Sequence, residues 1–248
     1  GMSAMKHATL LIINLERVYT MDKVNGLPVV FQHAFIAVHH DKILAVGCGH
    51  WQEYADKDTR ILDGRGHIAV PGFIEVEAQL TPLDKRDSVR LQLEECMQYM
   101  HHGTLTLAHP ALYPSLTAQP YIEITNPMSK QLPIVYPYVE LEKKKRTYSG
   151  RFCISAAGKY PIHDQLSAAQ LLGIAERYDS WQLLQALTCW PAQALNRKEL
   201  GCIHRHAQAD ILLFAHSDIH ALFHTLGAQH LSQVIKKGIR VFPNILIS

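Results

Sequence analysis

Four polar residues stand at or just beyond the ends of apolar segments, where enzymes often present functional groups: Glu77, Gln79, His109 and His163. Glu77 and Gln79 are two positions apart, so in a strand their side chains share one face. A carboxylate and two imidazoles are able to bind a metal ion or move protons, whereas the amide oxygen of Gln79 is a hard donor poorly suited to zinc. For His109 and His163 a structural role is the favoured interpretation, with ligand binding or catalysis as the alternative.

Short strands and a few helices are expected to position these residues. Alternating or apolar segments between turn residues predict strands over 9–14, 35–39, 43–46, 60–63, 104–108, 151–157, 209–214, 233–236 and 239–242, with one ambiguous strand around 132–139. Helical spacing of apolar residues predicts helices over 87–102, 164–178 and 180–187. Asp164 and Ser180 are the expected N-caps of the last two. His109 then follows one strand and His163 follows another.

Composition excludes several classes of protein. The 248 residues carry a net charge of +2, with no long basic run, so nucleic-acid binding has no electrostatic support. The apolar patch over 10–13 is too short for a membrane span or a signal peptide. The five cysteines are scattered without a Cys-x-x-Cys pair, which is typical of free thiols in a reducing compartment. We therefore expect a cytoplasmic protein with no nucleic-acid and no membrane partner.

A longer pattern surrounds Glu77 and Gln79. Residues 63–79 read DGRGHIAVPGFIEVEAQ. This run resembles the segment by which amidohydrolase-superfamily enzymes leave an N-terminal β-domain and enter the first strand of a metal-binding barrel. In that family the segment closes on His-x-His, whose histidines hold the metal that activates water. Because Glu77 and Gln79 replace both histidines, the resemblance implies the family fold with its zinc or iron site lost, and hence no metal ligand and no cofactor.

The last third of the chain extends the resemblance. Residues 188–195, TCWPAQAL, are similar to the family's Thr-x-x-Pro-Ala-x-Ala-Leu helix pair, and 201–203 with 209–214 to its return into the β-domain. Residues 222–238 are similar to the imidazolonepropionase branch. Two departures accompany these matches. His206-Ala207 replaces the usual Gly-Lys, and alanine stands near 155–158, where the family's general-base aspartate would fall.

The resemblance and the chain length together predict the architecture. We expect an α/β protein with a composite β-sandwich from both termini, residues 1–70 and 200–248, and a truncated TIM-like α/β barrel over 71–199. A complete barrel needs roughly 250 residues, so about four βα units fit, and the strands with the family's remaining metal histidines are expected to be absent. Open strand edges would remain, which favours a homodimer joined through the barrel.

Two functions remain open for such a protein. One is an inactive relative, a pseudoenzyme that acts as a binding or assembly module. The other is a hydrolase of non-peptide C–N bonds in small cyclic or linear amides, as in the imidazolonepropionase branch, with a small-molecule ligand. A second group of metal-competent side chains converging on Glu77 would favour the hydrolase, and His109 and His163 are the candidates. The other histidine clusters, over 204–206 and 216–224, are expected to be a turn and incidental surface residues.

Overall fold

The structure is a computed structural model that describes residues 6–84, 86–142, 147–158, 162–227 and 230–243. Both ends of the chain enter one mixed sheet of eight strands, which confirms the expectation that they share a sheet. Its order is β13-β12-β11-β5-β1-β2-β3, and β4 pairs with β1. The strands are β1 (Leu10–Val24), β2 (Leu27–His39), β3 (Lys42–Cys48), β4 (Arg60–Asp63), β5 (Ile68–Pro71), β11 (Ile211–Phe214), β12 (Leu231–Lys236) and β13 (Ile239–Phe242). A 3-10 turn, η1 (Trp51–Tyr54), follows β3.

The strands expected over 9–14 and 35–39 are the outer parts of one long hairpin, β1–β2. Asn25 and Gly26 close it with φ angles of 51° and 76°, as a tight two-residue hairpin turn requires. Polar residues interrupt the apolar pattern of β1 from Glu16 onward, so a prediction from this pattern ends the strand too early. Hydrogen bonds to β2 extend the strand through this polar part.

Alternate residues of the central strands enter different cores. Ile68 and Val70 of β5 pack with the helices in one core, while Ala69 packs with β1 and β2 in the other. Leu212 and Leu213 of β11 divide in the same way. Since successive strand residues point to opposite faces, the centre of the sheet is covered on both sides. Hydrogen bonds connect the strands of the large sheet without a break from β13 to β3. The division of the chain into a composite sandwich and a truncated barrel stays a prediction.

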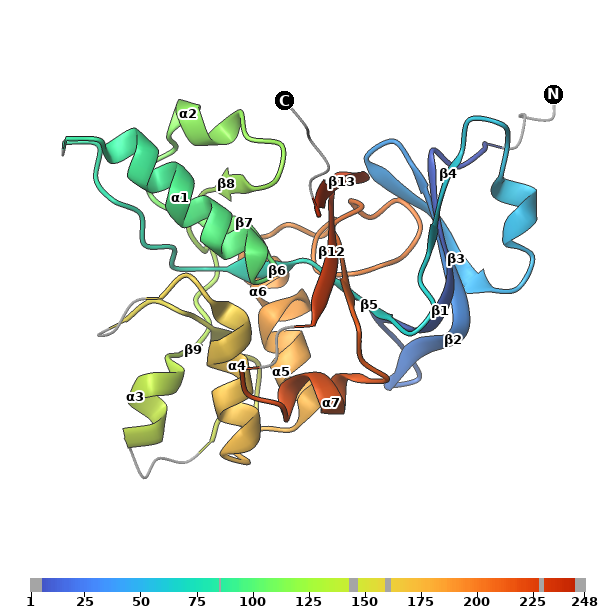
Figure 1. Cartoon of the computed structure of the whole chain (residues 1–248). Helices are drawn as coiled ribbons and strands as arrows, with labels where there is room; N and C mark the ends of the chain where they lie inside the picture. Colours follow the sequence, from blue (N-terminus) through green and yellow to red (C-terminus); the bar gives the residue numbers. More distant parts are fainter. Residues whose placement is uncertain (1–5, 85, 143–146, 159–161, 228–229, 244–248) are drawn as a thin grey trace.

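Shorter parallel strands and the helices form the other side of the molecule (Figure 1). One parallel sheet has the order β6-β7-β8, and β10 pairs with β9 in another. The strands are β6 (Phe73–Glu75), β7 (Thr104–Ala108), β8 (Glu123–Thr125), β9 (Ile134–Val135) and β10 (Cys153–Ile154). The helices are α1 (Ser88–His101), α2 (Pro114–Thr117), α3 (Pro137–Glu142), α4 (Gln165–Ile174), α5 (Ser180–Leu187), α6 (Cys189–Ala194) and α7 (Ile219–Phe223). In the described part of the chain, none of the helices is long and apolar enough to cross a membrane.

Several expected elements differ from those observed. The expected strand over 151–157 shrinks to β10, that over 132–139 divides into β9 and α3, and β8 was not expected. The helix over 164–178 ends at Ile174, close to Glu176, whose φ of 55° is incompatible with a helix. Asp164 caps α4 as expected, but Asp179 rather than Ser180 caps α5, because Asp179 and Gln182 form a capping box.

A buried ion-pair network joins β8 to the large sheet. The side chain of Lys236 on β12 is 1% exposed, and its Nζ donates to Glu123 Oε1 at 2.6 Å and to Asp210 Oδ2 at 2.7 Å. Arg197 Nη2 lies 3.2 Å from Glu123 Oε2, and Gln208 Nε2 donates to Glu123 Oε1 at 2.8 Å. Burial alone would raise the pKa of Glu123, but Lys236, Gln208 and Arg197 outweigh it and hold the pKa at about 2. The network therefore contains an ionised carboxylate between the two parts of the molecule.

Candidate functional site

The run over 68–79 contains two strands, β5 and β6, which belong to different sheets. β5 pairs with β1 and β11 in the large sheet, whereas β6 pairs with β7. Gly72 makes the crossing between them, and a Cβ there would lie 2.6 Å from Leu105 Cδ1. A side chain at this position would have to displace that of Leu105, which a glycine avoids. The crossing places Glu75, Glu77 and Gln79 at the C-terminal end of β6.

Gln165 holds β6 against its neighbours. Its Nε2 donates to the carbonyl oxygens of Ile74 at 3.0 Å and Ile154 at 2.9 Å, and its Oε1 accepts from Thr104 Oγ1 at 2.8 Å. The buried amide of Gln165 therefore ties β6, β10 and β7 together. Satisfied buried polar groups of this kind fix one arrangement of the strands, because an unpaired amide in the same place would be costly.

Glu75 is a fully buried carboxyl at the end of β6. Its Oε1 accepts from the backbone N of Ala156 at 2.8 Å, and its Oε2 accepts from the backbone N of Glu77 at 3.1 Å. Burial raises the pKa of Glu75 to about 7, although these bonds and one with Ser155 oppose the shift. The nearby Glu77 raises that pKa further, since two carboxylates disfavour each other's charge. Glu75 therefore changes its protonation state near neutral pH.

The Glu77 side chain is exposed to solvent and contacts Tyr136. The phenol O–H of Tyr136 donates a hydrogen bond to Glu77 Oε2. Burial, followed by this bond to a carboxylate, raises the pKa of Tyr136. The result is an exposed carboxylate with a protonated phenol beside it, which are groups used in general acid–base chemistry.

His163 and Gln79 come together, but through the backbone of Gln79. His163 Nε2 lies 3.2 Å from Gln79 O and 3.2 Å from Glu95 Oε2, while Tyr99 Oη accepts from Gln79 N at 3.2 Å. Burial favours a higher pKa for Glu95, but the hydrogen bonds from His163 and Thr81 outweigh it and lower that pKa. His163 and Glu95 thus form an ion-pair-like contact beside the end of β6.

The His109 side chain contacts residues of its own loop. Its Nδ1 accepts from the backbone N of Ala111 at 3.1 Å, and its ring lies 5.4 Å from that of Tyr113. Among the described residues, the polar contacts of this imidazole are local. The structural role of His109 stays a prediction.

The other two histidine clusters have partners away from the end of β6. His204 lies in a turn, with Nδ1 2.9 Å from Asp22 Oδ1. The rings of His220 and His224 stack at 4.0 Å around the end of α7. Neither contact involves the end of β6.

The donor set at β6 does not fit the zinc site of the family. Within the described ranges, no group of three or more His, Cys, Asp or Glu residues is arranged to hold a metal ion. Both Glu75 oxygens accept backbone N–H bonds, Glu77 accepts from Tyr136, and Gln79 supplies an amide. Zinc instead selects imidazole, thiolate and free carboxylate ligands. The absence of zinc or iron from the protein in solution stays a prediction.

Three residues of this site, Glu75, Glu95 and Tyr136, were not among the candidates from the sequence. For Glu75 a signal existed: in an extended strand it shares the face of Glu77 and Gln79. Glu95 lies in α1, and nothing in the sequence distinguishes it from an ordinary acidic residue on a helix surface. Tyr136 lies in the proline-rich stretch, where no periodicity predicts its direction.

No family model matches the sequence, and no curated protein sequence matches it. Solved structures do share its fold. Zinc-bound atrazine chlorohydrolase TrzN from Arthrobacter aurescens TC1 has a TM-score of 0.64 at 15% identity, over 96% of this chain and 97% of that one. A zinc-bound adenosine deaminase from Xanthomonas campestris has 0.67 at 13%, over 96% and 93%. Molinate hydrolase has 0.66 at 10%, over 96% and 95%. All three belong to the amidohydrolase superfamily, so its fold, which the sequence resemblance implied, is confirmed for this chain.

Proposed function

Because the chain has an amidohydrolase fold, we propose that it is a hydrolase of non-peptide C–N bonds in small cyclic or linear amides. The observation that supports this most is the carboxylate of Glu77, which is exposed at the C-terminal end of β6 with the Tyr136 phenol bonded to it. The C-terminal ends of parallel strands are where barrel enzymes place their reacting groups. One structural neighbour is a deaminase by name, and a deaminase also breaks a C–N bond.

The chemistry of this proposal needs one proton carrier. Glu77 accepts a proton from a water molecule as the water oxygen attacks the carbonyl carbon of the substrate. The C–N bond then breaks, and the same proton passes from Glu77 to the leaving nitrogen. The O–H of Tyr136 orients the Glu77 carboxylate by donating to Oε2. The buried Glu75 acts as a positioning residue, since it accepts from the backbone N of Glu77.

The loss of both family histidines favours a second function. Glu77 and Gln79 replace the metal ligands, and Ala156 and Ala157 stand near the position of the family's aspartate. We propose, as the alternative, an inactive relative that binds a small molecule or assembles with another copy. The two proposals differ in one property, which is turnover.

Turnover is measured by incubating the purified chain with a panel of small amides, ureas and cyclic imides and detecting new amine or carboxylate by NMR. We expect hydrolysis of at least one compound, lowered about 100-fold or more in Glu77→Gln, as for loss of a general base. Glu94→Gln removes a carboxylate from the exposed surface of α1 and serves as the matched control, with unchanged turnover. No product from any compound would favour the inactive alternative. Equal rates in Glu77→Gln and Glu94→Gln would refute the role of Glu77.

A further inference from the structure

A cavity of ≈ 490 Å³ lies in the large sheet, away from β6, and shares no residue with the candidate site. It is formed where four segments meet: the start of β1, the β2–β3 turn, β4, and the β12–β13 turn. Its lining residues are Thr9, Leu10, His40, Asp41, Arg60, Leu62, Lys237, Gly238, Ile239 and Arg240. Cavities that hold small organic ligands span roughly 300–1,000 Å³, so this one has a suitable size.

Hydrogen bonds between distant segments hold the cavity walls. Arg60 N donates to Thr9 O at 3.1 Å, and His40 N donates to Thr9 Oγ1 at 2.9 Å. Gly238 N donates to Ala209 O at 2.9 Å, and a Cβ at Gly238 would lie 1.7 Å from His40 O. The β12–β13 turn is therefore pressed directly against the β2–β3 turn. Walls fixed in this way form the cavity before any ligand arrives.

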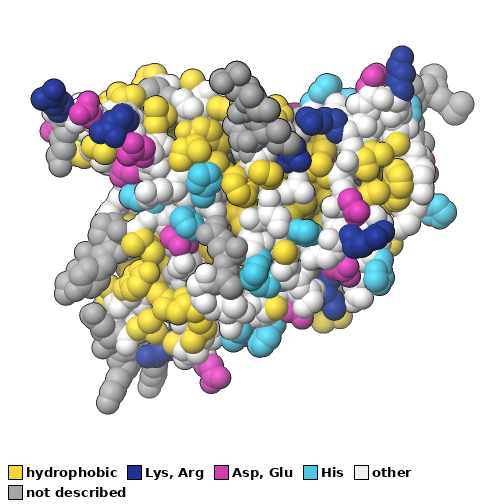
Figure 2. Space-filling model, viewed as in Figure 1, with side chains coloured by type: hydrophobic (Ala, Val, Ile, Leu, Met, Phe, Trp, Pro, Cys, Tyr) yellow, Lys and Arg dark blue, Asp and Glu magenta, His cyan; other side chains and the backbone are white. Residues whose placement is uncertain are grey.

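The cavity combines an apolar surface with unpaired positive charge. Leu10, Leu62 and Ile239 are apolar members of the lining, and Ile239 is 63% exposed. Figure 2 shows Lys and Arg side chains beside apolar ones between β13 and the β1–β4 side of the molecule.

Three cations and one acid line this cavity. Arg60, Lys237 and Arg240 have no ion pair among the described residues, and Asp41 is the one carboxylate of the lining. Three positive charges against one negative charge leave an excess of two positive charges. An apolar surface edged by free guanidinium groups is complementary to a molecule with the opposite arrangement, since Arg binds carboxylate and phosphate through paired N–H donors.

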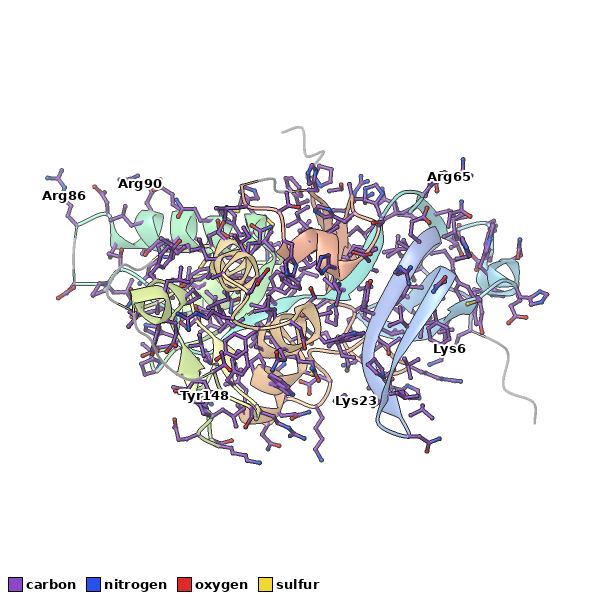
Figure 3. The ribbon with its side chains drawn as sticks, turned by 90° about the horizontal axis from the view of Figure 1, so that it is seen from below. Lys6, Lys23, Arg65, Arg86, Arg90 and Tyr148 are labelled. Carbon is purple, nitrogen blue, oxygen red and sulfur yellow. The ribbon has the colours of Figure 1, made fainter. Side chains whose placement is uncertain are left out.

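A second cavity of ≈ 260 Å³ adjoins the first and extends its charge. It shares His40 and Asp41 with the first cavity and adds Lys6, Lys42 and Arg205. Lys6 lies on the hairpin side of the molecule, where Figure 3 also labels Arg65 on a separate loop. The positive potential of this surface is therefore larger than that of the first cavity alone, which raises the local concentration of anions.

We propose that the first cavity binds a small amphiphilic anion, an apolar chain or ring that ends in a carboxylate or a phosphate. The apolar body lies on Leu10, Leu62 and Ile239, and the anionic group pairs with Arg60 and Arg240. Such a site is independent of turnover at β6, so the chain binds this class of ligand whether or not it is a hydrolase.

The test uses the full chain and four probes below their micelle concentrations: octanoate, octyl phosphate, 1-octanol and octylammonium. Isothermal titration calorimetry measures each affinity. We expect both anions to bind, and the tighter of the two identifies the preferred head group. We expect 1-octanol and octylammonium to bind at least about tenfold more weakly, because a charge-assisted bond is lost. Affinity for the anions should also fall as salt is added, since the cations face solvent.

Two variants complete the experiment. Arg60→Gln with Arg240→Gln in one chain should weaken binding of the better anion about tenfold or more. Arg65→Gln, which removes an exposed arginine outside the lining, should leave it unchanged. Thermal melts of both variants should match the parent, since none of these cations has an ion pair in the described chain. The proposal is overturned if 1-octanol binds as tightly as octanoate, if the double variant behaves like Arg65→Gln, or if neither anion binds.

Discussion

Replacing Lys236 by methionine removes the cation that links β12 to β8. Its Nζ contacts carboxylates of two different elements, Glu123 at 2.6 Å and Asp210 at 2.7 Å, and the side chain is 1% exposed. Methionine fills a similar volume without the charge, so both carboxylates lose a buried partner. Removal of one member of a buried ion pair costs about 3–5 kcal/mol, because the remaining charge stays desolvated.

The pKa of Glu123 gives a second magnitude. It lies at about 2 rather than 4.5, and each unit corresponds to about 1.36 kcal/mol, so the charged environment stabilises the folded state by roughly 3 kcal/mol. Gln208 and Arg197 supply part of this and remain in the variant. We therefore expect Lys236→Met to lower the free energy of unfolding by about 3 kcal/mol at pH 7. Urea titrations followed by far-UV circular dichroism measure this loss.

Acid provides an independent check on the cause. Glu123 has a depressed pKa in the folded state, so its contribution is complete above pH 4.5 and is lost as the pH falls toward about 2. The gap between the parent and Lys236→Met should therefore shrink below pH 4.5. Lys237→Met, at the exposed next position, is the matched control and should change stability by less than about 0.5 kcal/mol. A loss below about 1 kcal/mol, or a gap that does not shrink in acid, would refute the reasoning.

Four further outcomes are expected. Elemental analysis of protein purified without chelator should find no stoichiometric zinc or iron, because Glu77 and Gln79 replace the family histidines; about one metal per chain would contradict this. Burial raises the pKa of Glu75 to about 7, so the stability that the neutral carboxyl allows is complete below pH 4.5 and is lost as pH rises through 7. In urea titrations, Glu75→Gln should therefore gain roughly 2–3 kcal/mol of stability relative to the parent between pH 5 and pH 8. Parallel pH profiles of the two proteins would show that Glu75 does not titrate there. Deletion of 232–248 removes β13 and most of β12 and should unfold β1 and β2 as well, whereas an unchanged cooperative melt would rule out a shared sheet. Light scattering should give about twice the 28.0 kDa chain mass, since short parallel strands leave edges that a second copy can cover, and a clean monomer would argue against that interface.

Much of the secondary structure is predictable from local sequence, and the reason is periodicity. The apolar stripe of α1 and the buried run of β7 are observed within a residue or two of their expected bounds. The segment over 63–79 implied the superfamily fold by its resemblance, and the structure places its Pro71-Gly72 pair at the crossing between two sheets. Polar strands such as the second half of β1 are not predicted from apolar periodicity, since hydrogen bonds to a partner strand stabilise them.

Part of the candidate site was likewise predictable from the sequence, and part depends on the tertiary structure. The replacement of two histidines by Glu77 and Gln79 is visible in the sequence, and so is their common strand face. That Tyr136 bonds to Glu77 depends on the path of the proline-rich stretch, which no local pattern determines. Gln79 meets His163 through its backbone rather than its side chain, which also depends on how α1 and α4 pack.

The resemblance of the sequence therefore implied the superfamily fold and the substitution at the metal positions, and the few strands expected at each end predicted that both chain ends share one sheet. The tertiary structure alone decided which charges are buried. Glu75 and Glu123 are both strand glutamates, yet burial raises the pKa of one to about 7, and Lys236 with its neighbours holds the other at about 2. The physical reason is that a pKa depends on desolvation and on charges within a few ångströms. For Glu123 the decisive charge lies 113 residues away in the chain, and only the packing of two different sheets brings it to 2.6 Å.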